Sequence, residues 1–127
     1  MKTRLIEPTD GIYPARDYAH GIQIEDMRKL IFTAGTMGLT PDFRPPETLE
    51  EQLTLVWQNL SRILAAADMT LDDIIRVTSY LRRADYAAAN RDARLAALGG
   101  RRIPTTAIVA ETLEPGWMIE IEAIAAA

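Results

Sequence analysis

The closing segment of the chain constrains the fold most strongly, because two β-branched runs flank the turn sequence Glu114-Pro115-Gly116. The runs cover residues 101–111 and 117–125, which predicts two neighbouring antiparallel strands joined by a short loop. Side chains alternate along the second strand, with Ile119, Ile121, Ala123 and Ala125 on one face and Met118, Glu120, Glu122 and Ile124 on the other. A face that mixes carboxylates with apolar side chains suits neither bulk solvent nor a closed core. We therefore expect a functional site on that face.

Length and composition narrow the classes of protein that this chain can represent. Its 127 residues fit one domain, residues 1–127, which can bury a core without disulfides or a metal. With no cysteine and one histidine, a thiolate or His-rich metal site is excluded, and we expect no metal and no cofactor. The net charge of −4 argues against a nucleic-acid partner, which requires a basic face. No apolar run approaches the ~20 residues that span a bilayer, so we expect a cytoplasmic protein without a membrane partner.

The first half of the chain predicts strands followed by a helix. A short strand is expected over residues 3–7, and residues 18–25 and 29–35 are expected to form a β-hairpin. Thr48 with Glu51 three residues later has capping-box spacing and predicts a helix start. The helix then carries an apolar stripe of Leu49, Leu53, Val56, Leu60 and Leu64, broadened by Trp57, Ile63 and Ala67.

The second half predicts a central strand and another helix before the closing segment. Residues 74–81 form a β-rich run with Ile75, Val77, Ser79 and Leu81 on one face and Ile74, Arg76, Thr78 and Tyr80 on the other. Asp85 is the expected N-cap of a helix over residues 86–98, which Gly99-Gly100 ends.

The predicted order β-β-β-α-β-α-β-β indicates an α+β fold, with one mixed sheet and two helices on one of its faces. The uncovered face would present Ile74, Tyr80, Ile108 and Met118 together with Arg76, Thr78, Thr106, Glu120 and Glu122. A large exposed apolar patch is unusual on a monomer, so we expect self-association through this face.

Several segments resemble the Rid family, also called YjgF or the reactive intermediate deaminase A family. They are Tyr18-Ala19-His20-Gly21-Ile22, Ile31-Phe32-Thr33-Ala34-Gly35, Asn90 and the closing run 119–125. The resemblance implies a chorismate mutase-like fold and a homotrimer that binds a small metabolite in clefts between subunits. It also implies hydrolysis of enamines and imines that pyridoxal phosphate enzymes release.

The resemblance also implies roles for individual residues. Tyr18 would close one wall of the cleft, Gly35 would offer its backbone to the substrate, and Asn90 would support the pocket from the second helix. Glu120 would hold and activate the attacking water, which is general acid-base catalysis. An imine carbon is already electrophilic, so this chemistry needs no metal.

One position departs from the family pattern. Deaminase members carry arginine two residues after the proline of the fifth strand, where it grips the substrate carboxylate, and this chain has Thr106 after Pro104. Ala34 replaces a serine found in many members. We therefore expect Thr106 to line a site for a substrate other than the usual 2-imino acids. Arg102, or an arginine of a neighbouring subunit, is one candidate for the missing carboxylate anchor.

Other interpretations of the same residues stay open. Glu120 can also be a solvated or interface carboxylate, Asn90 an exposed helix residue, and His20 a structural histidine. The function can be that of a non-catalytic metabolite-binding or regulatory trimer. A ribonuclease or translation-inhibitor role is ascribed to some relatives, but the acidic pI and the lack of a basic, aromatic-interleaved stripe weigh against it.

Overall fold

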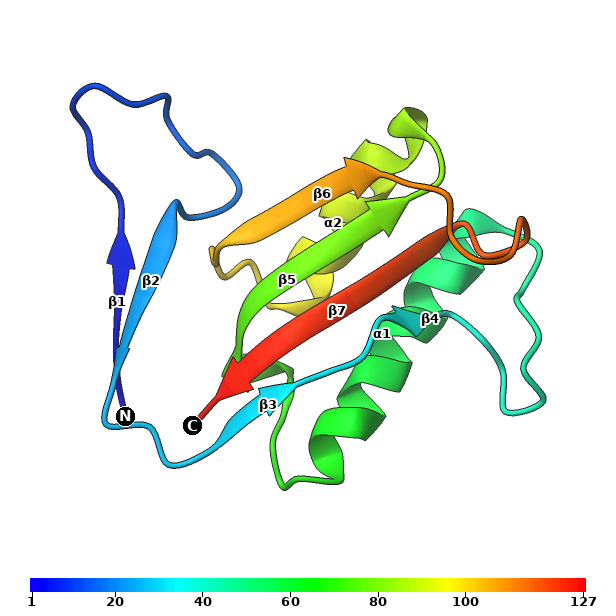
Figure 1. The fold of residues 1–127 in the computed structure, drawn as a ribbon, viewed down its shortest axis with the longest axis horizontal. Helices are drawn as coiled ribbons and strands as arrows, with labels where there is room; N and C mark the ends of the chain where they lie inside the picture. The colour runs from blue at the N-terminus through cyan, green and yellow to red at the C-terminus, as the bar shows by residue number, and fades with distance from the viewer.

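The computed structural model describes residues 1–127 and is drawn in Figure 1. Its elements in chain order are β1 (Lys2–Ile6), β2 (Gly21–Glu25), β3 (Leu30–Phe32), β4 (Thr36–Met37), α1 (Leu49–Ala65), the 3₁₀ helix η1 (Leu71–Asp73), β5 (Ile74–Leu81), the 3₁₀ helix η2 (Ala84–Tyr86), α2 (Ala87–Ala97), β6 (Thr105–Val109) and β7 (Ile119–Ala126). None of the helices is both long enough and apolar enough to cross a lipid bilayer.

The main sheet is mixed, and both α-helices cover the same face of it (Figure 1). Its strand order is β3-β7-β5-β6, with β4 also paired to β7. β5 and β6 run parallel, whereas the other pairs are antiparallel. The predicted α+β class, with two helices on one face of a mixed sheet, is confirmed.

The predicted pairing of the two closing strands is wrong, because β5 lies between them. β6 pairs with β5 in parallel, and β7 pairs with the opposite edge of β5. The connection from β5 to β6 passes through α2, and such a crossover is what a parallel pair requires. Residues 110–118 then cross the end of β5, where Ala110 N–H donates to Leu81 O and Arg82 N–H donates to Met118 O.

The predicted hairpin between residues 18–25 and 29–35 is also wrong. β2 pairs with β1 in a separate two-stranded ribbon, which stands apart from the main sheet in Figure 1. Asp26 adopts a positive φ of 57°, and the N–H groups of Arg28 and Lys29 both donate to Ala127 O. These contacts direct the chain away from β2 and place β3 beside β7.

The first helix forms as its sequence predicts, apart from one residue of the stripe. Thr48 caps it, accepting a hydrogen bond from Glu51 N–H and donating one from its hydroxyl to the Glu51 carboxylate at 3.0 Å. The buried members of the apolar stripe include Leu53, Val56, Trp57, Leu60 and Leu64. Ile63 remains 40% exposed, so it does not broaden the buried stripe as expected.

Two local predictions in the second half need correction. A β-bulge between Ile74 and Arg76 shifts the alternation, so Ile74 is fully buried in the core instead of lying on the uncovered face. Asp85 does not cap α2, because it lies within η2 and pairs with Arg83 at 2.9 Å. α2 ends before Gly99 and Gly100, whose positive φ angles allow the chain to leave the helix.

Two amide side chains on α1, the buried Gln52 and the half-buried Asn59, hold the segments beside the candidate site. Gln52 donates from Nε2 to Pro46 O and to Gly116 O, both at 2.9 Å, and its Oε1 accepts from Met118 N–H. Asn59 donates from Nδ2 to Met37 O and to the carbonyl of residue 39, both at 3.1 Å. The segment that leads into β7 and the end of β4 are therefore held against one helix.

Candidate functional site

The uncovered face of the main sheet, called the open face below, presents alternate side chains of β5, β6 and β7. Two rows cross it, as the strand register shows: Thr106, Thr78 and Glu122 in one, and Ile108, Tyr80 and Glu120 in the next. Arg76 and Ile124 lie on the same face. The mixture of carboxylates and apolar side chains predicted for β7 is therefore present on a helix-free sheet surface.

Glu120 lies against a glycine that makes room for its carboxylate. Glu120 pairs with Tyr80 on β5 and with Met37 on β4, next to the Gly35 backbone. A Cβ atom at position 35 would lie 2.9 Å from Glu120 Cδ and closer still to Oε2. The absence of a side chain at Gly35 thus determines where this carboxylate can lie.

The carboxylate of Glu122, the next one along this face of β7, accepts a hydrogen bond from a tyrosine. The Tyr80 hydroxyl donates to Glu122 Oε1 at 2.7 Å, and this hydrogen bond, followed by desolvation, raises the pKa of Tyr80. Tyr80 therefore remains a neutral donor in the ordinary pH range. Glu120 has no hydrogen-bonding side chain and no ion-pair partner in the chain, so its carboxylate can accept from a ligand or a water molecule.

Two hollows flank this region of the open face. The first, of about 190 Å³, is lined by Phe32, Thr33, Arg76, Thr78, Glu122, Ala123 and Ile124. The second, of about 200 Å³, is lined by Tyr80, Ala110, Glu111, Thr112, Leu113 and Glu120. Thr106 lies beside the first hollow, where its Oγ1 accepts a 2.9 Å hydrogen bond from Arg76 Nη2.

Within one chain, Tyr18 and Asn90 lie away from Glu120 and do not share a site with it. Tyr18 lies in the loop after β1, with its ring edge-on to His20, and burial is the main cause of its raised pKa. Asn90 lies on α2 and is only 4% exposed, on the side of the sheet that the helices cover. Its Oδ1 has no hydrogen-bond partner. The structure thus brings together Glu120 and Gly35, with Thr106 on the same face, but not the other two predicted site residues.

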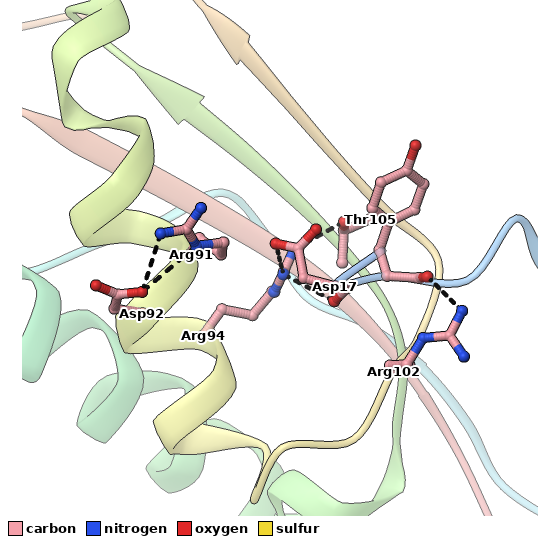
Figure 2. Close-up of polar contacts among 7 residues, drawn as sticks. Asp17, Arg91, Asp92, Arg94, Arg102 and Thr105 are labelled. Atoms are coloured by element: carbon pink, nitrogen blue, oxygen red, sulfur yellow. Dashed lines mark hydrogen bonds and ion pairs between the residues drawn. The ribbon is translucent and has the colours of Figure 1, made fainter. Parts of the chain in front are cut away.

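An ion pair between a buried arginine and a half-buried aspartate, which the sequence analysis did not identify, anchors the loop that carries Tyr18 (Figure 2). Arg94 of α2 donates from Nη2 to Asp17 Oδ2 at 2.9 Å and from Nη1 to Thr105 Oγ1 at 2.9 Å, with 9% of its side chain exposed. Arg102 donates to Tyr18 O at 3.0 Å and pairs with Glu7. Arg102 is therefore engaged by this loop and does not lie on the open face.

No group of three or more His, Asp or Glu side chains converges in a way that could hold a metal ion. The polar groups available on the open face are carboxylates, hydroxyls and one guanidinium. This donor set can bind a small polar organic molecule and move a proton at Glu120.

Comparison with known proteins identifies relatives over nearly the whole chain. The family model described as Endoribonuclease L-PSP matches residues 9–127. The RutC family protein YjgH of Escherichia coli is 38% identical over 70 residues, which cover 55% of this chain and 51%, about half, of that protein. Protein HMF1 of Saccharomyces cerevisiae is 26% identical over 113 residues, covering 88% of this chain and 85% of that protein.

Solved structures share the fold over the full chain. The Rid family protein YyfB of Yersinia pestis has a TM-score of 0.83 at 24% identity, and each chain is covered completely. RidA of Psychrobacter sp. PAMC 21119 has a TM-score of 0.72 at 22% identity, with 98% of this chain and 100% of that chain covered. At these identities the likeness shows the fold alone.

Proposed function

The chain belongs to the Rid/YjgF/YER057c/UK114 family, and on this premise we propose that it hydrolyses the C=N bond of a small imine, which an enamine forms by tautomerisation. The observation that carries the proposal is the unpaired Glu120 carboxylate, which the side-chain-free Gly35 accommodates beside a hollow on the open face. A carboxylate placed in this way can hold a water molecule and accept its proton.

The reaction requires only water and proton transfers. Starting from the protonated imine, Glu120 accepts a proton from water while the water oxygen bonds to the C=N carbon and the C=N electron pair passes to nitrogen, which gives a neutral carbinolamine. Glu120 then donates this proton to the nitrogen. As the C–N bond breaks, the carboxylate accepts the hydroxyl proton, so that a carbonyl forms and ammonia departs, and this last proton leaves with the ammonia as ammonium. General acid-base assistance of this kind contributes typically ~10²- to 10⁴-fold in rate.

We further propose that the working form is a cytoplasmic homotrimer with its sites in clefts between subunits. Phe32 is 69% exposed and Ile108 is 48% exposed in one chain. Burying these apolar side chains between subunits would stabilise the oligomer. Tyr18 and Asn90 lie away from Glu120, so a cleft that uses all three residues needs a second chain. Light scattering should give about three times 14.1 kDa, and a mass near 14.1 kDa would contradict the trimer.

The substrate is proposed to differ from a simple 2-imino acid. Thr106 supplies one neutral hydroxyl, which is already bonded to Arg76, so it offers no charge to a carboxylate. This observation also supports the second candidate function, a trimer that binds a small metabolite without hydrolysing it. The ribonuclease activity in the name of the matched family model is disfavoured by the net charge of −4.

Ammonia release tests the proposed function directly. Imines generated in place by amino-acid oxidases would be followed with and without the protein, because they also hydrolyse spontaneously. Acceleration above the spontaneous rate supports the deaminase. Binding of keto acids by the intact oligomer with no acceleration of any imine would contradict the deaminase and favour the binding function.

A further inference from the structure

A further hollow, called the aromatic hollow below, lies at the N-terminal end of α1 and outside the open face. Its volume is about 360 Å³, and five residues line it: Phe43, Pro45, Glu114, Gly116 and Trp117. None of these residues lines either hollow of the open face. Gln52 in the first turns of α1 donates a 2.9 Å hydrogen bond to Gly116 O, which fixes the loop before β7 against the helix. The aromatic hollow is therefore a separate feature on the helix side of the molecule.

Two aromatic rings form a corner of the aromatic hollow. The ring centroids of Phe43 and Trp117 are 5.8 Å apart, and the ring planes meet at 74°. Two rings in edge contact at nearly a right angle leave a corner whose walls are ring faces, and the face of an aromatic ring carries partial negative charge. No lysine or arginine lines the hollow. A cation in this corner would therefore be attracted by both rings.

The backbone holds Phe43 in a conformation that an aromatic residue rarely adopts. Its φ angle is +68°, in the left-handed region that favours glycine. A tight turn imposes this angle, because Phe43 N–H donates to Thr40 O and Thr40 N–H donates to Arg44 O, both at 2.9 Å. The ring is 67% exposed, so its burial offsets little of the strain. Strained residues of this kind cluster at sites that contact ligands.

Trp117 and Glu114 supply a fixed wall and a carboxylate. Trp117 is 9% exposed, and its backbone N–H donates to Glu114 O at 3.0 Å, which holds the two residues together. The Trp117 indole N–H makes no hydrogen bond within the chain and is not enclosed by it. The Glu114 carboxylate forms no hydrogen bond and no ion pair, whereas Arg44, the basic residue next to Phe43, pairs with Asp42 at 3.3 Å. The carboxylate is thus available to a cation in the hollow.

We propose that the aromatic hollow binds a small organic cation of the quaternary ammonium class. The two ring faces and Glu114 attract the charge, while the alkyl groups of the cation make apolar contacts with the rings and with Pro45. The adjacent hollow along α1 contains Glu50 and Glu51 and no basic residue, which adds to the negative potential. This inference depends neither on Glu120 nor on the proposed hydrolysis.

Two molecules of the same shape test this site on the intact oligomer. Choline and 3,3-dimethylbutan-1-ol differ at the centre of the trimethyl group, which is a positively charged nitrogen in the first and a neutral carbon in the second. Titrations followed by the NMR signal of the Trp117 indole N–H should show about 10-fold or greater preference for choline. The indole signal of Trp57, which lies in the core, should not move and serves as the internal reference. Trp117→Phe identifies the reporting signal by its loss.

Three variants separate the aromatic hollow from other exposed aromatic side chains. Phe43→Leu keeps an apolar side chain but removes the ring face, so it should abolish the preference for choline. Glu114→Gln should weaken choline binding by about 2- to 5-fold. Tyr13→Leu is the matched control and should retain the preference, because Tyr13 is 66% exposed but lies outside the hollow.

Three outcomes would overturn the inference. The first is a Trp117 signal that choline leaves unchanged, which is also the result expected if the oligomer covers the hollow. The second is equal affinity of the wild type for the two molecules. The third is a preference that survives Phe43→Leu with the fold intact by circular dichroism.

Discussion

Replacing Gly35 by alanine should reduce activity while leaving the fold intact. The added Cβ would lie 2.9 Å from Cδ and 3.2 Å from Cγ of Glu120, whereas unbonded carbon atoms normally approach to about 3.5–4.0 Å. The carboxylate must therefore move by about 1 Å. It can do so, because the obstructed atoms are the end of a flexible side chain and not backbone.

A displacement of about 1 Å at a reacting group can cost ~10²-fold in rate, so kcat/KM for imine hydrolysis should fall by about that factor. The free energy of unfolding should change by less than about 1 kcal/mol, since Gly35 has no positive φ. Ammonia release and chemical denaturation would be measured on the same preparation.

Gly116→Ala is the matched control. Its Cβ would make only an ordinary 3.6 Å contact with Pro45, so neither activity nor stability should change appreciably. Full activity in Gly35→Ala would refute the argument that this glycine sets the position of Glu120. A large loss of stability would show instead that the glycine serves the fold.

Three further variants test the core, the loop anchor and the open face. Leu60→Ala should lower the free energy of unfolding by ~2–5 kcal/mol, because Leu60 is fully buried, and a thermal midpoint within a degree or two of the wild type would contradict this. Arg94→Met should cost about 1–3 kcal/mol in chemical denaturation, because it removes the charge-assisted hydrogen bonds to Asp17 and the bond to Thr105, whereas a change no larger than that of Arg91→Met, which removes an exposed pair with Asp92, would contradict a stabilising role. The folded-state pKa of Tyr80 lies above its usual 10.0, so its hydrogen bond to Glu122 stabilises the fold below that pH and is lost as pH rises through the raised pKa. The difference in thermal midpoint between wild type and Tyr80→Phe should thus shrink between about pH 9 and about pH 11, and a constant or widening difference would contradict the assignment.

The sequence predicts most elements of this fold but not their pairing. The cap at Thr48, the leucine stripe and the alternation along β7 are local patterns, and each reports the face that an element buries. Strand partners depend on contacts between distant segments. Nothing local to residues 105–109 indicates that they lie beside β5, or that β2 leaves the main sheet for β1. The bulge after Ile74 likewise moves one side chain into the core without a local signal.

The candidate site, too, could be predicted where it depends on a local pattern and not where it depends on contacts between distant segments. The placement of carboxylates on one face of β7 follows from alternation alone, so the face that contains Glu120 could be predicted. The Asp17–Arg94 pair could not, because it joins residues 77 positions apart. The only sequence signal for this ion pair is Arg94 itself, a charged residue one turn after Asn90 on the alanine-rich helix α2. The bond from Arg76 to Thr106 depends on the parallel pairing of β5 with β6, which the sequence analysis did not predict.

Comparison of Glu120→Gln with Glu122→Gln tests the central claim most directly. Both changes remove one carboxylate from the open face of β7, but only Glu120 lacks a hydrogen-bonding partner in the chain. With an imine that the wild type hydrolyses, Glu120→Gln should lower kcat/KM by ~10²-fold or more, and Glu122→Gln should retain activity to within about 10-fold. Equal rates for wild type and Glu120→Gln, with the oligomer intact, would show that Glu120 does not activate the attacking water.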